Sequence, residues 1–273
     1  MKNVNKIVVF DLDETLGYFL EFGMFWEAFT NYLNSNSNVN KHNINLSQDQ
    51  FNVLFDLYPE FCIPDIIKIL EYLKEQKEKC ICNKIMIYTN NQGPREWVEY
   101  IKKYFENKIN YKLFDQIIGA FKINGKAIEI CRTSHLKNHK DLVRCSKIPI
   151  HTHICFLDDV FYPKMSNNNV YYINIKPYVY DLTFDTMISR FINNKISESY
   201  NISNKSEFKE FMISFMKNYQ YLFNRKKQEE YTIDKELSKQ ILNHLHIFFT
   251  KPFSSNTRKN NLKKGKNKTK KKI

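Results

Sequence analysis

The feature that most constrains this chain is a short apolar run near its beginning that ends abruptly in two carboxylates. Residues 7–10 read Ile-Val-Val-Phe, and the sequence DLDET follows at residues 11–15. An unbroken run of β-branched and aromatic residues is typical of a strand that is buried on both faces of a parallel sheet. Ligands of open α/β sheets bind at the carboxyl ends of the strands, so Asp11 and Asp13 stand where side chains can act on a ligand.

Four further apolar runs are predicted strands, and most segments between them are predicted helices. The strands are expected at residues 84–88, 114–121, 153–157 and 170–175. Apolar residues at helical spacing predict helices at residues 22–33, 51–58, 64–73, 97–105, 208–222 and 237–248. Strands that alternate with helices predict an α/β fold with a Rossmann-like core, in which helices flank a central parallel sheet.

This pattern also predicts how the chain is divided. Residues 1–195 are expected to form the core, with residues 20–60 as a helical insertion near its site. Residues 196–252 are expected to form a helical extension at the C-terminal end. The Asn-rich and Ser-rich segment 34–47 predicts a surface loop, and residues 124–139 show no periodic pattern and predict irregular structure.

The net charge of +13 is concentrated at the end of the chain. Nine basic residues and no acidic residue lie between positions 258 and 272, which leaves +4 for the rest of the protein. Residues 253–273 are therefore predicted to be a disordered basic tail. Nuclear localisation, contact with nucleic acid and simple solubility remain alternative roles for this tail.

The cysteines and the hydropathy favour an intracellular protein, nuclear or cytoplasmic, and the basic tail favours the nucleus. The six cysteines include no C-x-x-C pair, and Cys80 and Cys82 are too close for the usual zinc spacing. We expect reduced and buried thiols, with Cys131 as a small packing residue. No apolar stretch approaches the ~20 residues that span a bilayer, and residues 1–6 lack the apolar core of a signal peptide. No membrane partner is expected.

Polar residues of complementary chemistry follow three of the predicted strands. They are, in chain order, Asp11 and Asp13, Thr89 and Asn90, and Asp158 and Asp159. Lys140 lies between the last two groups, with Lys137 as the alternative lysine. The carboxyl ends of parallel strands meet at one edge of a sheet, so we expect these side chains to lie close together. These residue types suit the metal-assisted removal of a phosphoryl group.

Each residue type has a distinct task in that chemistry. Asp11 can attack phosphorus and form an acyl phosphate, and Asp13 can protonate the leaving oxygen and later deprotonate water. Thr89 and the backbone amide of Asn90 can hold phosphoryl oxygens, and Lys140 can neutralise their charge. A phosphate dianion repels a carboxylate, so Mg²⁺ is the expected cofactor, with oxygen ligands from Asp11, Asp13, Asp158 and Asp159.

The order of these motifs resembles the four motifs of the haloacid dehalogenase (HAD) superfamily. The variant DLDETL at residues 11–16 is similar to the FCP/SCP-type branch, the carboxy-terminal-domain phosphatases that act on phosphoserine and phosphothreonine. Pro64 before a helix, Cys131-Arg132 and the KDL sequence at residues 140–142 also resemble that branch. The resemblance covers roughly residues 6–195 and implies the site roles given above.

The chain departs from that branch between the first motif and Pro64. The branch usually carries a small β insertion that helps to form a peptide groove, whereas residues 20–60 here predict helix and loop. The absence of a large inserted cap predicts an open site, suited to macromolecular substrates. The favoured function is a Mg²⁺-dependent phosphatase for phosphorylated protein. The same chemistry on a nucleic-acid end or a small phosphometabolite, and a catalytically retired binding module, remain alternatives.

Two further sets of residues leave their roles open in the sequence. Arg132 is compatible with an extra phosphate contact or with a surface salt bridge. The spacing of His135, His139, His151 and His153 matches no zinc pattern, so surface or capping roles are expected for them.

Overall fold

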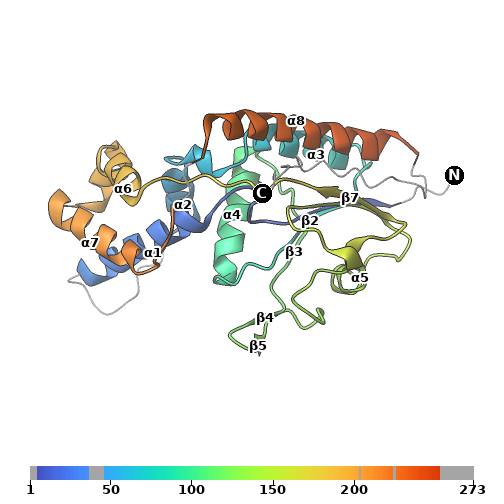
Figure 1. Cartoon of the computed structure of the whole chain (residues 1–273), viewed down its shortest axis with the longest axis horizontal. Coiled ribbons are helices and arrows are strands. Elements are labelled where there is room, and N and C mark those ends of the chain that lie inside the picture. Colours follow the sequence, from blue (N-terminus) through green and yellow to red (C-terminus); the bar gives the residue numbers. More distant parts are fainter. Residues whose placement is uncertain (1–4, 37–45, 203, 224–225, 253–273) are drawn as a thin grey trace, which may run out of the picture.

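A sheet of five parallel strands forms the centre of the computed structural model, which describes residues 5–36, 46–202, 204–223 and 226–252 (Figure 1). The strand order is β3-β2-β1-β6-β7. The bounds are β1 (Lys6–Phe10), β2 (Lys84–Tyr88), β3 (Gln116–Ile118), β6 (His153–Asp158) and β7 (Val170–Asn174). The parallel sheet with helices on both faces confirms the predicted α/β fold.

The central strand β1 is buried on both faces, as its unbroken apolar run predicts. Ile7 and Val9 share a hydrophobic cluster with Leu142 on one face, and Val8 and Phe10 belong to the larger cluster on the other. Figure 1 shows one helix below the sheet and others above it or against its side. The helix below is α5 (His139–Ser146), and the others are α3 (Ile66–Glu78), α4 (Arg95–Lys108) and the C-terminal helix α8 (Gln228–Thr250).

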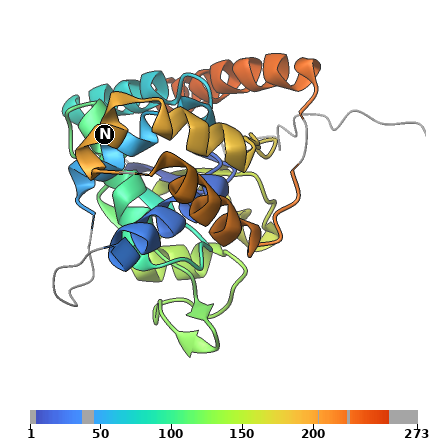
Figure 2. The same ribbon diagram turned by 90° about the vertical axis from the view of Figure 1, so that its left-hand side faces the viewer.

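Further helices pack together beyond the carboxyl ends of the strands, at the left of Figure 1 and facing the viewer in Figure 2. This helical module consists of α1 (Leu20–Asn36), α2 (Gln48–Phe55), α6 (Phe184–Ile192) and α7 (Lys205–Lys217). Aromatic rings join its helices: the centroids of Phe29 and Phe191 lie 5.0 Å apart, and those of Tyr32 and Phe208 lie 4.8 Å apart. The segment after residue 195 is thus divided, because α7 packs on α1 while α8 lies against the sheet.

A small antiparallel hairpin replaces part of the segment that was expected to be irregular. It consists of β4 (Lys122–Ile123) and β5 (Lys126–Ala127), and the predicted strand 114–121 is shortened to β3. Asn124 and Gly125 form the turn with φ values of 48° and 79°. Both lie in the left-handed region, which an Asn-Gly hairpin turn requires. The Asn-Gly pair was therefore a hairpin signal within the sequence.

Several helix ends also differ from the predictions. Helix α7 ends at Lys217, before the predicted limit at residue 222, and α8 begins well before residue 237. Short 3₁₀ helices occur at Pro59–Phe61, Pro163–Met165 and Lys195–Tyr200. In the described part of the chain, no helix is both long enough and apolar enough to cross a membrane. Residues 37–45 of the predicted loop and the predicted basic tail 253–273 lie outside the described residues.

The cysteines correct one expectation from the sequence. Cys131 and Cys145 form a disulfide, with their Cα atoms 5.1 Å apart, so these two residues are not reduced thiols. Cys145 lies in α5, whose folding brings it next to a residue 14 positions earlier in the chain. The remaining thiols, at Cys62, Cys80, Cys82 and Cys155, are free as expected, but only Cys82 and Cys155 are buried, and Cys80 is exposed.

Candidate active site

The predicted site segments meet at the carboxyl edge of the sheet, where β2, β1 and β6 lie side by side. Phe10 pairs with Ile87 on one side and with Leu157 on the other. The backbone N–H of Asp11 then donates to the carbonyl oxygen of Leu157 at 2.8 Å, which brings Asp11 next to Asp158. The central place of β1 in the sheet makes its motif the centre of the site.

Three carboxylates gather at this edge and form what we call the acid trio. Asp11, Asp158 and Asp159 each place an oxygen within 4.8 Å of the others. The Thr15 hydroxyl donates to Asp159 at 3.3 Å, and the Asn174 amide donates to the backbone carbonyls of Asp158 and Asp159. Hard oxygen ligands of this kind suit Mg²⁺, so the residues present fit the predicted cofactor. Within the described residues, no histidine or cysteine belongs to such a group.

The lysine in the site is Lys137, so the prediction of Lys140 is wrong. Its Nζ lies 2.7 Å from Asp11 Oδ1 and 2.7 Å from Asp158 Oδ2, and its side chain is only 1% exposed. Burial lowers the pKa of Lys137, but the charges of Asp11 and Asp158 outweigh burial and raise it above its ordinary value. Lys137 is therefore a buried cation held between two members of the acid trio. Burial also raises the pKa of Asp158 to about 7, against the opposing effect of Lys137.

The start of α5 explains why Lys137 and not Lys140 enters the site. Asn138 is the N-cap of α5, and its side chain accepts a hydrogen bond from the backbone N–H of Asp141 at 2.8 Å. Lys140 consequently falls in the first helical turn, where it is exposed to solvent. Lys137 precedes the N-cap, and its side chain reaches Asp11 and Asp158 at the strand ends. Asparagine is a strong N-cap residue, so this signal was available in the sequence.

Asp13 is not a member of the acid trio, although it was predicted as a further metal ligand. Its Oδ2 accepts a hydrogen bond from the side-chain amide of Asn91 at 2.9 Å. Burial raises the pKa of Asp13 to about 6, while the bond from Asn91 lowers it and Asp11 raises it further. A carboxyl with a pKa near neutrality can donate and accept a proton, as the predicted acid/base role requires. Asn91 is a site residue that sequence reasoning did not single out.

Thr89 and Asn90 follow β2 directly, as predicted. Hydrogen bonds from the Asn91 backbone and from the Arg132 side chain fix their positions. The Thr89 hydroxyl accepts a hydrogen bond from the backbone N–H of Asn91 at 2.9 Å. Arg132 donates to the Thr89 carbonyl at 3.0 Å, to the Gly119 carbonyl at 2.7 Å and to Asn90 Oδ1 at 2.8 Å. Arg132 is buried and its guanidinium donates to the loop after β2, so it is not a surface salt bridge. It fixes the loop that follows β2.

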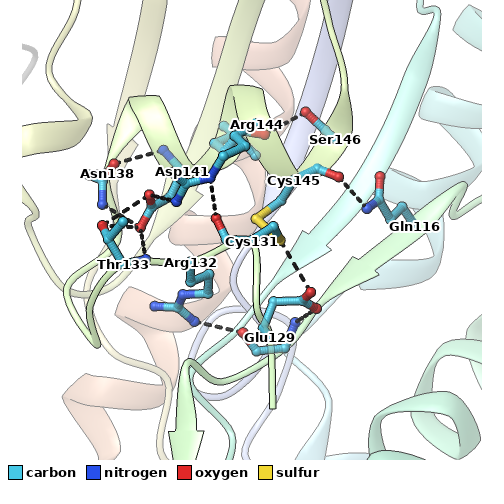
Figure 3. The surroundings of a disulfide bond; sticks show 12 residues. Gln116, Glu129, Cys131, Arg132, Thr133, Asn138, Asp141, Arg144, Cys145 and Ser146 are labelled. Atoms are coloured by element: carbon cyan, nitrogen blue, oxygen red, sulfur yellow. Dashed lines mark hydrogen bonds and ion pairs between the residues drawn. A yellow bond between two sulfur atoms is a disulfide. The ribbon is translucent and has the colours of Figure 1, made fainter. Parts of the chain in front are cut away.

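Asp141 organises the segment that carries Lys137, as Figure 3 shows. Its carboxylate accepts hydrogen bonds from the backbone N–H of Thr133 at 2.8 Å and from the Asn138 amide at 2.8 Å. Burial raises the pKa of Asp141, but these hydrogen bonds and Arg144 lower it below its ordinary value. The ionised Asp141 therefore holds residues 133–138 in one conformation, which positions Lys137.

The disulfide ties the beginning of the same segment to α5 (Figure 3). Arg144 adds a hydrogen bond from its Nε to the Cys131 carbonyl at 2.6 Å, and its Nη2 forms an ion pair with Asp141. Cys131 directly precedes Arg132, so the covalent bond lies one residue from the side chain that fixes the loop after β2. The disulfide is thus a structural support for the site.

Comparisons with known proteins give little beyond this geometry. No protein-family model matches the sequence, and no curated protein matches it either. Among solved structures, a HAD-superfamily hydrolase from Ehrlichia chaffeensis is similar over 79% of this chain and 100% of that chain, with 14% identity and a TM-score of 0.34. A likeness of this degree does not establish a common family. The functional argument therefore rests on the site itself.

Proposed function

We propose that this chain is a Mg²⁺-dependent phosphatase of the HAD type, which removes phosphate from phosphoserine or phosphothreonine in proteins. The observation that carries the proposal is the buried ammonium of Lys137 between Asp11 and Asp158 at the carboxyl edge of a parallel sheet. The three carboxylates of the acid trio exceed this single ammonium by two charges when all are ionised. A divalent cation would balance that excess, and the resemblance of the DLDETL sequence at residues 11–16 to the FCP/SCP-type branch supports the choice of substrate.

The first half of the reaction would transfer the phosphoryl group to the enzyme. A carboxylate oxygen of Asp11 attacks phosphorus, and the bond from phosphorus to the seryl or threonyl oxygen breaks. Asp13 gives its proton to that oxygen, so the substrate leaves as an alcohol. Lys137 and the loop at Thr89 stabilise the charge on the phosphoryl oxygens.

The second half would release phosphate and restore the enzyme. Asp13, now ionised, takes a proton from a water molecule that attacks the aspartyl phosphate. Orthophosphate leaves, Asp11 is again a carboxylate and Asp13 again carries a proton. Mg²⁺ bound by the acid trio would neutralise negative charge on the carboxylates and on the phosphoryl group.

The test is the hydrolysis of p-nitrophenyl phosphate with and without Mg²⁺ by the wild type and by Asp11→Asn. We expect Mg²⁺-dependent release of nitrophenol that falls by at least about 10³-fold in the variant, since the nucleophile is lost. Asp49→Asn is a matched control, because Asp49 is exposed in the first turn of α2. Hydrolysis that persists in Asp11→Asn, or that does not respond to a chelator, would contradict the proposed mechanism.

A further inference from the structure

A large groove is lined by the proposed acid/base residue Asp13 and by residues of α1 and the start of α4. Its volume is about 740 Å³, and Asp13 and Asn91 are among the residues that line it. Asn91 links the acid/base residue to the groove. Its side chain donates a hydrogen bond to Asp13 and accepts one from the backbone N–H of Gly93, which lines the groove. If Asp13 protonates the leaving oxygen, the rest of the leaving group must lie on this side of the site.

The walls of this aromatic groove are formed by large, well-packed rings. Trp26 of α1 and Tyr100 of α4 have ring centroids 5.5 Å apart, and the Trp97 ring packs on Phe51 at 5.6 Å. Trp26, Trp97 and Tyr100 are partly exposed and line the groove. Rings fixed by their neighbours give an apolar surface that loses little conformational entropy when a ligand binds.

The charged groups of the groove are all of one sign. Glu14, Glu27 and Glu96 line it together with Asp13, and none of its described lining residues is Lys, Arg or His. The Glu27 carboxylate also accepts a hydrogen bond from the Tyr219 hydroxyl at 2.6 Å, which holds this acid at the groove edge. Such a surface attracts cationic side chains and repels a polyphosphate backbone.

We propose that the aromatic groove binds the polypeptide next to the phosphorylated residue and selects substrates with a large apolar side chain and a lysine or arginine there. The inference rests on the proposed function, because it places the leaving group beside Asp13. The rings would take the apolar side chain, and Glu27 and Glu96 would pair with the cation. A nucleic-acid end fits poorly, because its backbone would meet four carboxyl side chains.

The test measures binding, so that it does not depend on turnover. Three fluorescent phosphoserine peptides are compared by anisotropy on Asp11→Asn: one with Trp and Arg beside the phosphoserine, one with Glu in place of Arg, and one with Ala in place of Trp. A 5′-phosphorylated single-stranded oligonucleotide is the fourth ligand. We expect the Trp-Arg peptide to bind at least about fivefold more tightly than each of the others.

A second set of variants ties this preference to the groove. In the Asp11→Asn background, adding Glu27→Gln and Glu96→Gln should reduce the ratio of Arg-peptide to Glu-peptide affinity to about one. Glu99→Gln is the matched control on α4, because Glu99 pairs with Lys102 and does not line the groove. It should leave the ratio unchanged. Because each ratio is measured within one protein, a partly unfolded variant does not distort it.

The outcomes separate this inference from the proposed function. Equal affinities for the three peptides, tighter binding of the oligonucleotide, or an Arg preference that survives the loss of both glutamates would overturn the inference. Phosphatase activity of the wild type on p-nitrophenyl phosphate would stand in each of these cases. Conversely, a wild type without phosphatase activity would contradict the proposed function. The anisotropy measurements would still show whether the groove prefers the Trp-Arg peptide.

Discussion

Glu21 is a buried carboxyl whose removal should change how the stability of this protein depends on pH. It is fully buried in the first turn of α1, and its Oε2 accepts a hydrogen bond from the backbone N–H of Leu182 at 3.1 Å. Among the described residues, its Oε1 has no hydrogen-bond partner. Burial raises the pKa of Glu21 from 4.5 to about 8, although the bond from Leu182 lowers it. The folded protein therefore holds this proton more tightly than the unfolded chain.

The sign and size of the effect follow from this difference in pKa. The free energy of unfolding should fall as pH rises from about 4.5 to about 8, and it should be level above that range. The full rise of the pKa corresponds to about 5 kcal/mol, at about 1.4 kcal/mol for each pKa unit. The positive N-terminal end of α1 favours the ionised carboxylate by up to about 1 kcal/mol, and relaxation reduces the effect further. We expect a loss of about 3 kcal/mol between pH 5 and pH 9 from this group.

The assay is urea unfolding of the wild type and Glu21→Gln at pH 5, 7 and 9. Glutamine cannot ionise, so the loss of stability between pH 5 and pH 9 should be about 3 kcal/mol smaller in the variant. Glu71→Gln is the control, because Glu71 is exposed on α3. The wild type and Glu21→Gln share all other titrating groups. Parallel pH dependences of their free energies of unfolding would therefore refute the reasoning.

The remaining predictions concern the support of the site. Lys137→Met should lower kcat/KM for p-nitrophenyl phosphate at least about 10³-fold, because two buried carboxylates lose their cation, whereas exposed Lys140→Met should change it less than about twofold. Cys145→Ser should lower the free energy of unfolding by about 3 kcal/mol in urea without reductant, and the reduced wild type should match it. Arg132→Lys should lower kcat/KM about tenfold, since lysine cannot keep the bonds to the loop at Thr89; unchanged kinetics would contradict this positioning role.

The sequence predicted the sheet and the strand ends because both depend on local patterns. β1, β2 and β6 are unbroken apolar runs, and polar residues follow each of them directly. Parallel pairing then brings Asp11 and Asp158 together without further information. Lys137 was missed as the first choice because its place depends on the residue at which α5 begins. Lys140 is only three positions after Lys137, yet it lies inside α5 and is exposed, whereas Lys137 precedes the helix and is buried.

Other features depend on contacts that no local pattern encodes. The pairing of Cys131 with Cys145 requires α5 to fold back beside residue 131. The helical module requires Phe208 of α7 to reach Tyr32 of α1, across most of the chain. The aromatic groove likewise arises only when α1 and α4 lie together. The sequence predicted an open site from the absence of a large inserted cap, but it could not predict what lies beside that site.

The loop between β1 and α1 explains why the helical module and the acid/base residue are linked. Gly17 lies so close to Phe61 that a Cβ there would come within 2.4 Å of the Phe61 carbonyl oxygen, so only glycine fits. The neighbouring N–H of Tyr18 donates to the same oxygen at 2.7 Å. On the other side, the Glu14 carbonyl accepts a hydrogen bond from the N–H of Tyr178 at 2.9 Å. These contacts hold the loop of Asp13 between the segments that lead from α2 and into α6. The segments that follow α2 and precede α6 therefore fix the position of the proposed proton donor, and the same two helices belong to the helical module.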